Sequence, residues 1–498
     1  MAISKILVAN RGEIAVRVFR TAKALGIKTV AVYSEADASA IHKTLADEAV
    51  FIGDSAPSES YLNADKILDA ARQTGADAIH PGYGFLSERA EFSEACKQAG
   101  VTFIGPPAEA MHKLGAKIDA KQIAVDNQVP ITPGFFVPGA TDFQLREAAQ
   151  DIGFPVMLKA SAGGGGRGMR VVRALESFDD ELATAKDEAL KGFGDDAMMV
   201  EKLVENPRHI EVQFIADQHG NVACLFEREC SIQRRHQKLI EEAPSPYKNI
   251  ESLWPEMRDA TKRLIKAAGY YGAGTAEFMV DPISGAFYFL EVNARLQVEH
   301  CVTEEITGLD LVALQIAVAD GKPLEIPQET LDGERQAIFG HSIEARIVAE
   351  DPGMGFMPSI GKIVGWAEPR SPGIRFDTGF GKGSEISRFY DSMIAKVVAH
   401  GGTRSEARKR LIAALQDFHV LGVKTNIGYI IDVLQSEGFI AGEIDTGYLG
   451  REFHDWQPSS PPAELGSIAK QATSQTQQNG QQKSFSVWDF TDNWRNAR

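Results

Sequence analysis

One run of ten residues contains the side chains best suited to chemistry. It reads Glu291-Val292-Asn293-Ala294-Arg295-Leu296-Gln297-Val298-Glu299-His300, so polar and apolar residues alternate. In an extended strand, neighbours on one face lie about 7 Å apart, and this strand would have one polar and one apolar face. The polar face would offer metal ligands, hydrogen-bond donors and a base. The plainer alternative is an amphipathic strand whose polar side faces water.

A glycine-rich segment follows a second predicted strand. This strand covers 154–159 and ends at Lys159, the next ten residues contain five glycines, and another strand is expected over 170–173. Glycines let backbone N–H groups approach phosphate oxygens, while Lys159 and Arg167 add positive charge. The segment is not a Walker A loop, because its lysine precedes the glycines and strands flank them. Together with residues 291–300, it favours phosphate binding over a merely flexible loop.

Five further motifs, by their order and spacing, indicate a family. They are NRGEIA at 10–15, HPGYGFLSE at 80–88, ENPRH at 205–209, ERECSIQRRHQK at 227–238 and YDSMI at 390–394. With them, the chain resembles the biotin carboxylase component of biotin-dependent carboxylases, which are members of the ATP-grasp superfamily. The resemblance covers about residues 1–450, and no single motif would be sufficient.

The pattern and the resemblance predict a multidomain protein of the α/β and α+β classes. A βαβ alternation predicts a doubly wound pre-ATP-grasp domain at 1–114, and a dinucleotide site there is disfavoured because no Gly-x-Gly-x-x-Gly occurs after the first strand. The resemblance adds an ATP-grasp domain at 115–330, with a mobile glycine-rich lid at about 135–204. A mostly antiparallel C-terminal biotin carboxylase domain is expected at 331–449.

The C-terminal segment departs from this pattern. Residues 450–484 are expected to be a disordered linker, because the stretch 471–484 is rich in Gln, Ser, Thr and Asn. Residues 485–494 then contain four aromatic side chains, including two of the five tryptophans. Exposed aromatic residues after a linker suggest that 485–498 is a peptide that docks on a partner subunit. The alternative is that it folds back on its own domain.

The resemblance implies a site for ATP and for two Mg²⁺ or Mn²⁺ ions. The metal ligands would be Glu277, Glu291 and Asn293, since hard oxygen ligands shared with phosphates suit magnesium. Backbone groups of 201–204 would hold adenine, and the other ATP contacts would be lysines, loop glycines, histidines and a glutamine. The ATP residues are Lys117, Lys159, Gly164, Gly165, Gly166, Gly168, Met169, Glu201, Lys202, Leu203, Val204, His209, Gln233 and His236.

The resemblance also implies the reaction. Lys238, Arg295, Gln297 and the backbone of Val298 would bind bicarbonate, and Glu299 would remove its proton. Attack on the γ-phosphate of ATP would give carboxyphosphate, which would break down beside biotin. Arg346 would then bind biotin and stabilise its enolate. The catalytic residues implied are Arg295, Glu299, Lys238 and Arg346.

Composition is consistent with a globular enzyme of several domains. The net charge of −16 argues against nucleic acid or an anionic membrane as a general partner. The four cysteines form neither a close metal pair nor a dense framework, which favours a reducing, cytoplasmic location. Met1 to Asn10 is expected to contain a first strand and not a signal peptide, and no bilayer-spanning stretch is seen.

Partners follow from what the chain does not contain. It has no Met-Lys dipeptide of the kind at which the family's carrier domain is biotinylated, so biotin is expected on a separate carrier protein. A carboxyltransferase subunit and a homodimer are also implied. The acceptor would be chosen by the transferase: acetyl-CoA is favoured, with fatty acid biosynthesis as the process, while propionyl-CoA, another acyl-CoA or pyruvate stay open.

Two alternative functions are also compatible with an ATP site. One is another ATP-grasp ligase that joins a carboxylate to an amine, and the other is a non-catalytic, ATP-binding regulatory homologue. The intact set of charged residues argues against both.

Two departures from the family pattern stand out. Ala116 lies where aspartate is frequent, which leaves the support of Lys117 open, and Cys301 follows His300 where proline is common.

Overall fold

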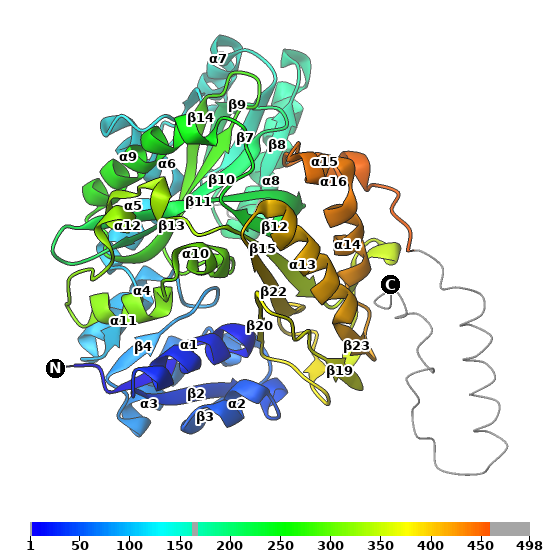
Figure 1. Cartoon of the computed structure of the whole chain (residues 1–498). Helices are drawn as coiled ribbons and strands as arrows, with labels where there is room; N and C mark the ends of the chain where they lie inside the picture. Colours follow the sequence, from blue (N-terminus) through cyan, green and yellow to red (C-terminus); the bar gives the residue numbers. More distant parts are fainter. Residues whose placement is uncertain (1, 162–167, 459–498) are drawn as a thin grey trace, which may run out of the picture. The chain divides into compact units, whose positions relative to one another are not determined.

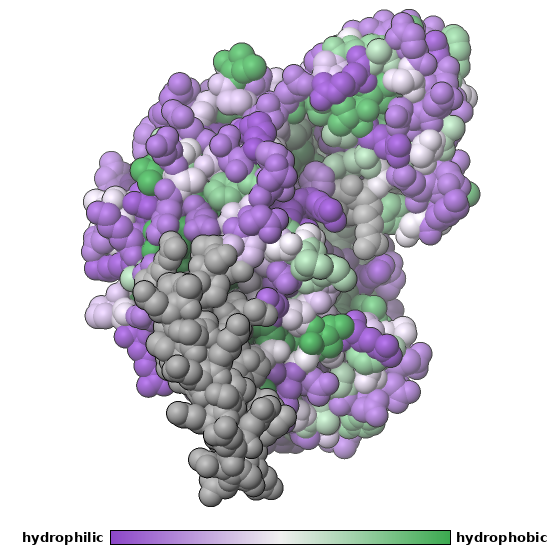
Figure 2. Space-filling view, turned by 90° about the vertical axis from the view of Figure 1, so that its right-hand side faces the viewer, coloured by the Kyte–Doolittle hydropathy of each residue, from purple (hydrophilic) through white to green (hydrophobic). Residues whose placement is uncertain are grey.

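The computed structural model describes residues 2–161 and 168–458, which divide into two compact units. The first unit consists of 87–338 and 444–450. The second consists of 2–86, 339–443 and the described residues from 451. In the described part of the chain, no helix combines the length and the apolar character needed to cross a membrane. On the face drawn in Figure 2, hydrophilic residues predominate and hydrophobic residues occur in scattered groups.

The second unit begins with parallel strands in the order β3-β2-β1-β4, which Figure 1 draws in blue. Ile6, Leu7 and Val8 of β1 are all fully buried, as expected for a strand covered on both faces. This arrangement confirms the doubly wound pattern that the sequence predicts. The elements are β1 Lys5–Val8, α1 Gly12–Ala24, β2 Lys28–Ser34, α2 Ile41–Leu45, β3 Glu48–Gly53, α3 Ala64–Thr74 and β4 Ala78–His80.

The C-terminal part of the second unit is mostly antiparallel, as predicted. Strands β15 (His341–Val348) and β20 (Ile374–Thr378) both pair with β22 (Met393–Gly401). Three short antiparallel pairs and three helices accompany them. These are β16 Glu350–Asp351 with β17 Met357–Pro358, β18 Gly361–Lys362 with β21 Glu385–Ile386, β19 Gly365–Ala367 with β23 His419–Leu421, α13 Arg404–Asp417, α14 Ile427–Gln435 and α15 Glu437–Ala441.

The predicted disordered linker requires a correction at its start. Helix α16 spans Tyr448–Glu452, and the residues after it are packed. The rings of Phe453 and Trp456 both contact Tyr429 on α14, and the Trp456 indole donates to Asp432 at 2.8 Å. Contacts of these partly buried rings with the buried Tyr429 therefore extend the folded part to at least residue 456. The rest of the predicted linker from 459, and the aromatic segment 485–498, lie outside the described residues.

The first unit is built on antiparallel strands in the order β14-β13-β10-β11-β12. Helices α9, α10, α11 and α12 contact these strands. The strands are β10 Arg208–Ala216, β11 Val222–Arg234, β12 Gln237–Ala243, β13 Gly272–Val280 and β14 Phe287–Asn293. The helices are α4 Ala90–Gln98, α5 Ala108–Gly115, α6 Lys117–Asp126, α9 Ile250–Ala268, α10 His300–Thr307, α11 Leu311–Ala319 and α12 Gln328–Asp332, and a short strand β5 covers Thr102–Phe103.

A smaller sheet in the same unit has its own apolar core. Its strands lie in the order β6-β9-β7-β8, with helices α7 and α8 packed against them. Leu145, Val156, Leu158, Phe178 and Val200 belong to this core. The elements are β6 Gly134–Phe135, α7 Asp142–Ile152, β7 Val156–Ala160, β8 Met169–Val172, α8 Phe178–Phe193 and β9 Met198–Lys202, and apart from Gly134 they fall within the range 135–204 predicted for the lid. A separate core gives this segment the means to move as one body, and its motion stays a prediction.

Candidate active site

Three acidic residues form a row across adjacent strands of the first unit. Glu211 on β10 lies opposite Glu277 on β13, and Glu277 lies opposite Glu291 on β14. On β10 the polar residues His209, Glu211 and Gln213 alternate with apolar ones and are all buried. A period of two places these side chains on one face of the sheet. The row therefore concentrates negative charge where water is largely excluded.

Lys238 on β12 supplies the cation that joins this row. Its Nζ lies 2.6 Å from Glu211, 3.0 Å from Glu277 and 2.7 Å from Glu299. Burial by itself would lower the pKa of Lys238, but attraction to these three carboxylates outweighs it and raises the pKa well above its usual value. The ammonium group stays charged as a result. It can hold the base candidate Glu299 at a fixed position.

The donor set around Glu277 and Glu291 fits a hard divalent cation. His209 Nε2 lies 3.0 Å from Glu277. Burial would raise the pKa of Glu277, but Lys238 and His209 hold it well below its usual range. Burial and repulsion from Glu277 raise the pKa of Glu291. Two buried carboxylates that repel each other are what a shared magnesium ion would stabilise in their charged forms.

The arginine of the alternating run is fixed by hydrogen bonds. Arg295 donates to Gln297 Oε1 at 2.6 Å and to Asn293 Oδ1 at 3.1 Å, and its Nε lies 3.2 Å from Glu88. The amide groups of Asn293 and Gln297 in turn donate to Glu277, at 2.8 and 3.3 Å. A planar guanidinium held in this way is suited to bind a small planar anion.

The strand predicted over 291–299 is wrong beyond its first three residues. Strand β14 ends at Asn293, residues 294–299 form an irregular turn, and helix α10 begins at His300. The polar side chains still meet, but they do so because the turn folds them around Glu277 and Lys238. Glu299 is the N-terminal flanking residue of α10 and is completely buried.

A second cationic group surrounds Glu201, which is nearly completely buried on β9. Lys159 Nζ lies 2.6 Å and Lys121 Nζ 2.5 Å from its two carboxylate oxygens. Burial would raise the pKa of Glu201, but these two lysines lower it to about 2. Burial lowers the pKa of Lys117, while Glu291 raises it and Lys159 lowers it further. These lysines are close enough to influence one another, which favours an anionic ligand beside them.

The remaining predicted ATP residues lie at the end of β9 and just after it, on β11 and in the turn after β11. Lys202 donates its amide to Pro133 and its side chain to Gly153, and the amide of Leu203 donates to Pro155, so these donors serve the fold. Gln233 is buried. His236 lies in the two-residue turn between β11 and β12, where it and Arg235 have φ values of 65° and 49°. Burial, then His209 and Lys159, lowers the pKa of His236.

Three family models match the chain. The model of the biotin carboxylase N-terminal domain covers 2–111, and that of the biotin carboxylase C-terminal domain covers 344–451. The model described as carbamoyl-phosphate synthase L chain, ATP binding domain, covers 116–327.

Proteins and solved structures agree with these matches. The methylcrotonoyl-CoA carboxylase subunit alpha of Dictyostelium discoideum is 45% identical over 99% of this chain and 70% of its own length. The propionyl-CoA carboxylase alpha chain of Caenorhabditis elegans is 48% identical over 89% of this chain and 61% of its own length. The crystal structure of a Campylobacter jejuni biotin carboxylase complex is 44% identical with a TM-score of 0.86, covering 90% of this chain and 99% of that one.

The chain belongs to the biotin carboxylase family. Solved relatives in this family are biotin carboxylases in complex with nucleotide, and one of them also contains magnesium and bicarbonate, which confirms the predicted enzyme class and cofactors. A second structure, the biotin carboxylase domain dimer of Hydrogenobacter thermophilus 2-oxoglutarate carboxylase with MgADP, ADP and bicarbonate, has 43% identity and a TM-score of 0.87 and covers 92% of this chain and 100% of that one. Among the curated relatives, this chain spans about two thirds of the methylcrotonoyl-CoA carboxylase subunits and 38% of the human pyruvate carboxylase.

Part of the glycine-rich segment predicted for this biotin carboxylase site can be placed in the structure. Gly164, Gly165 and Gly166 lie outside the described residues. Gly168 and Met169 are described, and the carbonyl oxygen of Gly168 accepts from the amide of Ala160 at 2.9 Å. This contact places the end of the loop beside the strand that carries Lys159.

Arg346, the predicted biotin residue, belongs to the second unit. On β15 it lies opposite Lys396 of β22. The Lys396 ammonium group is 2.9 Å from Glu13, and the Tyr83 hydroxyl donates to the same carboxylate at 2.5 Å. The half-buried guanidinium of Arg346 therefore neighbours a fully buried ion pair.

Sequence reasoning missed four charged residues around the site: Glu88, Lys121, Glu211 and Arg228. Arg228 is completely buried and donates to Glu211 and Gln213, each at 2.6 Å. The alternation of polar and apolar residues along 209–214 was the signal that could have found Glu211. Lys121 is four residues after Lys117, so both face the same side of a helix.

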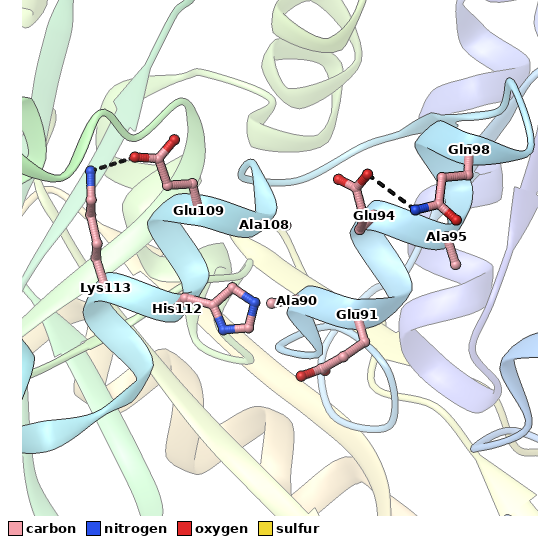
Figure 3. A pocket seen from close by; sticks show the side chains of 9 residues that line it. All are labelled: Ala90, Glu91, Glu94, Ala95, Gln98, Ala108, Glu109, His112 and Lys113. Atoms are coloured by element: carbon pink, nitrogen blue, oxygen red, sulfur yellow. Dashed lines mark hydrogen bonds and ion pairs between the residues drawn. The ribbon is translucent and has the colours of Figure 1, made fainter.

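A hollow of about 580 Å³ between α4 and α5 lies apart from these residues. Figure 3 shows its lining, in which Glu109 pairs with Lys113 and Gln98 donates to Glu94. None of the predicted site residues lines it.

Proposed function

We propose that this chain carboxylates biotin carried on a separate carrier protein, using Mg-ATP and bicarbonate. The observation that supports it most is the cluster of Lys238 with Glu211, Glu277 and Glu299, which faces the hydrogen-bonded Arg295 and Gln297. The cluster and these two residues combine an anion-binding group with a fixed buried carboxylate, and Glu277 also lies opposite Glu291, with which it forms the carboxylate pair suited to magnesium. An ATP-driven carboxylation needs each of these.

In the proposed reaction, Arg295, Gln297, the Val298 backbone and Lys238 hold bicarbonate beside Glu299. Glu299 removes the bicarbonate proton, and the resulting oxygen attacks the γ-phosphate of ATP to give carboxyphosphate and ADP. Magnesium held by Glu277, Glu291 and Asn293 would supply positive charge to the phosphate oxygens. Lys117 and Lys159 are proposed to bind the phosphates, with Gly164 to Gly166, Gly168 and Met169 covering them.

The remaining roles rest on the family resemblance. Residues 201–204, His209, Gln233 and His236 are proposed to contact the base, ribose and phosphates. Arg346 is proposed to bind the biotin ring and stabilise its enolate after carboxyphosphate breaks down to carbon dioxide and phosphate. The predicted domain limits also remain proposals.

The acceptor expected from the sequence needs revision. The relatives support neither acetyl-CoA in particular nor fatty acid biosynthesis, since they are methylcrotonoyl-CoA, propionyl-CoA and pyruvate carboxylases. We propose an acyl-CoA carboxylase of the methylcrotonoyl or propionyl type. Alignments with four methylcrotonoyl-CoA carboxylase subunits extend over 94–99% of the chain, against 90% for the human pyruvate carboxylase.

Partners and location are likewise proposals. We propose a biotin carboxyl carrier protein, a carboxyltransferase subunit and a homodimer, the last supported by the dimer named for the Hydrogenobacter thermophilus domain. All four cysteines are buried and none forms a disulfide, which suits a reducing compartment. Because the names of several relatives include the word mitochondrial, the cytoplasmic location stays a prediction.

The test is ADP release by the purified chain with Mg-ATP, with and without bicarbonate and free biotin. We expect release to require both, and Glu299→Gln to lower it by about 10²–10⁴-fold, the usual contribution of a general base. Glu305→Gln, on the same helix α10, serves as the matched control and should retain activity. Release without biotin would favour another ATP-grasp ligase, and no release would favour a regulatory ATP-binding protein.

A further inference from the structure

Two lysines share one buried carboxylate beside the proposed phosphate site. Glu201 is 1% exposed, and its two oxygens lie 2.5 Å from Lys121 and 2.6 Å from Lys159. The family resemblance gives Lys159 a role on the nucleotide phosphates and gives Lys121 none. A phosphate group could recruit Lys159 only by competing with Glu201.

The two lysines differ in how freely they can leave this carboxylate. The side chain of Lys121 is 3% exposed, against 13% for Lys159. Lys121 projects from α6 and also lies 4.9 Å from the ring of Phe136, a cation–π contact. Lys159 lies on β7, directly opposite Met169 at the end of the glycine-rich segment. Lys121 is therefore the fixed partner and Lys159 the one able to move.

A carboxylate buried to this extent needs a positive partner at all times. If Lys159 left and no other cation remained, Glu201 would be a buried, uncompensated charge, which is strongly unfavourable. With Lys121 in place, the charge stays balanced after Lys159 has turned to a phosphate. One carboxylate between two lysines can thus release one of them at little cost.

We propose that Lys121 is a positioning residue that holds Glu201 so that Lys159 can transfer from this carboxylate to a nucleotide phosphate. The inference rests on the proposed function, in which Lys159 binds phosphate. Lys121 itself touches no substrate. Its loss would trap Lys159 on Glu201 and weaken the binding of nucleotide, with no direct effect on the bicarbonate base.

The test is the affinity of the full chain for a non-hydrolysable ATP analogue with Mg²⁺, measured by calorimetry. Lys121→Met should weaken binding by about 30-fold or more, as expected when a buried charge pair loses one partner. Adding Glu201→Gln to this variant should restore binding to near the wild-type value, because Lys159 is then no longer held. Lys113→Met, at an exposed lysine of α5, is the matched control and should bind normally.

The outcomes separate the inference from the function on which it rests. If the wild-type chain failed to bind the analogue, the proposed function would fall. Normal binding by Lys121→Met, or weak binding that Glu201→Gln does not restore, would overturn the positioning role alone. Should Lys121→Met fold poorly, the double variant Lys121→Met/Glu201→Gln is informative by itself, because it removes both members of the buried pair: the proposal expects binding near the wild-type value, and clearly weaker binding would contradict it.

Discussion

At the scale of single residues, the site depends on buried charges that are balanced inside the protein. Arg228 is the clearest case, since its side chain is fully buried and donates to Glu211, Gln213, Thr303 and Thr275. Glu211 in turn contacts Lys238. Arg228 therefore fixes the carboxylate that orients Lys238, although it lies one step away from the proposed chemistry.

Replacement of Arg228 by methionine should strongly destabilise the first unit. Methionine fills part of the volume but leaves Oε1 of Glu211 and Oε1 of Gln213 without the Arg228 donor, and breaking a buried pair in this way costs about 3–5 kcal/mol. The free energy of unfolding in urea is the measurement. Arg72→Met removes an exposed pair with Asp69 and should cost less than about 1 kcal/mol. An equal loss in the free energy of unfolding in both variants would mean that the burial of Arg228 does not account for the destabilisation.

At the scale of elements, strand and helix ends supply the functional groups. Strand β14 ends at Asn293 and helix α10 starts at His300, and the turn between them carries Arg295, Gln297 and Glu299. Helix α6 begins with Lys117 directly after Ala116, which lies at its N-terminal flanking position and makes no side-chain hydrogen bond to the helix. The aspartate that is frequent in the family would be able to form one.

Ala116→Asp should stabilise the chain. An aspartate at this position can accept a hydrogen bond from the first turn of α6, a change worth about 0.5–2 kcal/mol. The measurement is the midpoint of thermal unfolding. Ala116→Asn tests the mechanism, since asparagine caps a helix without a negative charge. Stabilisation by aspartate but not by asparagine would point to charge attraction with Lys117 and not to capping.

At the scale of the whole molecule, the folded part reaches further along the chain than composition indicates. Phe453 and Trp456 pack on Tyr429 after the last helix. Composition placed this stretch in a linker because the polar residues that follow dominate the average. The packing of these two aromatic rings on Tyr429 fixes the position of the backbone that carries them.

Two truncated chains test this boundary. A chain that ends at residue 458 should unfold at the same temperature as one that also contains 459–498 and should retain biotin-dependent ADP release. A chain that ends at residue 450 loses both ring contacts and should be less stable by roughly 1–3 kcal/mol, the sum of two such aromatic pairs. Identical unfolding of the two short chains would contradict the packing. Loss of assembly with the carboxyltransferase in the 458 chain would support docking by the aromatic segment, and full assembly would refute it.

Sequence alone determined the family, the fold class and most of the residues that meet at the site. The order of the motifs was sufficient for this, because the chemistry of groups such as Lys238, Glu277 and Glu299 does not depend on whether the local backbone is a strand or a turn. The alternation of strands and helices predicted within 1–114 could also be read from the sequence, since the spacing of apolar residues is a local property. Outside the described residues, the glycines at 164–166 and the segment 485–498 remain predictions from sequence.

Only the tertiary structure decided which charges compensate one another. Pairing of β10 with β13 brings Glu211 opposite Glu277, 66 positions apart in the sequence, and no local pattern encodes that register. The same is true of Lys121 on helix α6 and Glu201 on strand β9, which are 80 positions apart in the sequence. The turn at 294–299 escaped prediction because alternation is equally compatible with a strand, whereas the contacts of Arg295 and Gln297 with distant residues favour the turn. Charge balance in a dry site depends on distances in space, and those are fixed only when the chain folds.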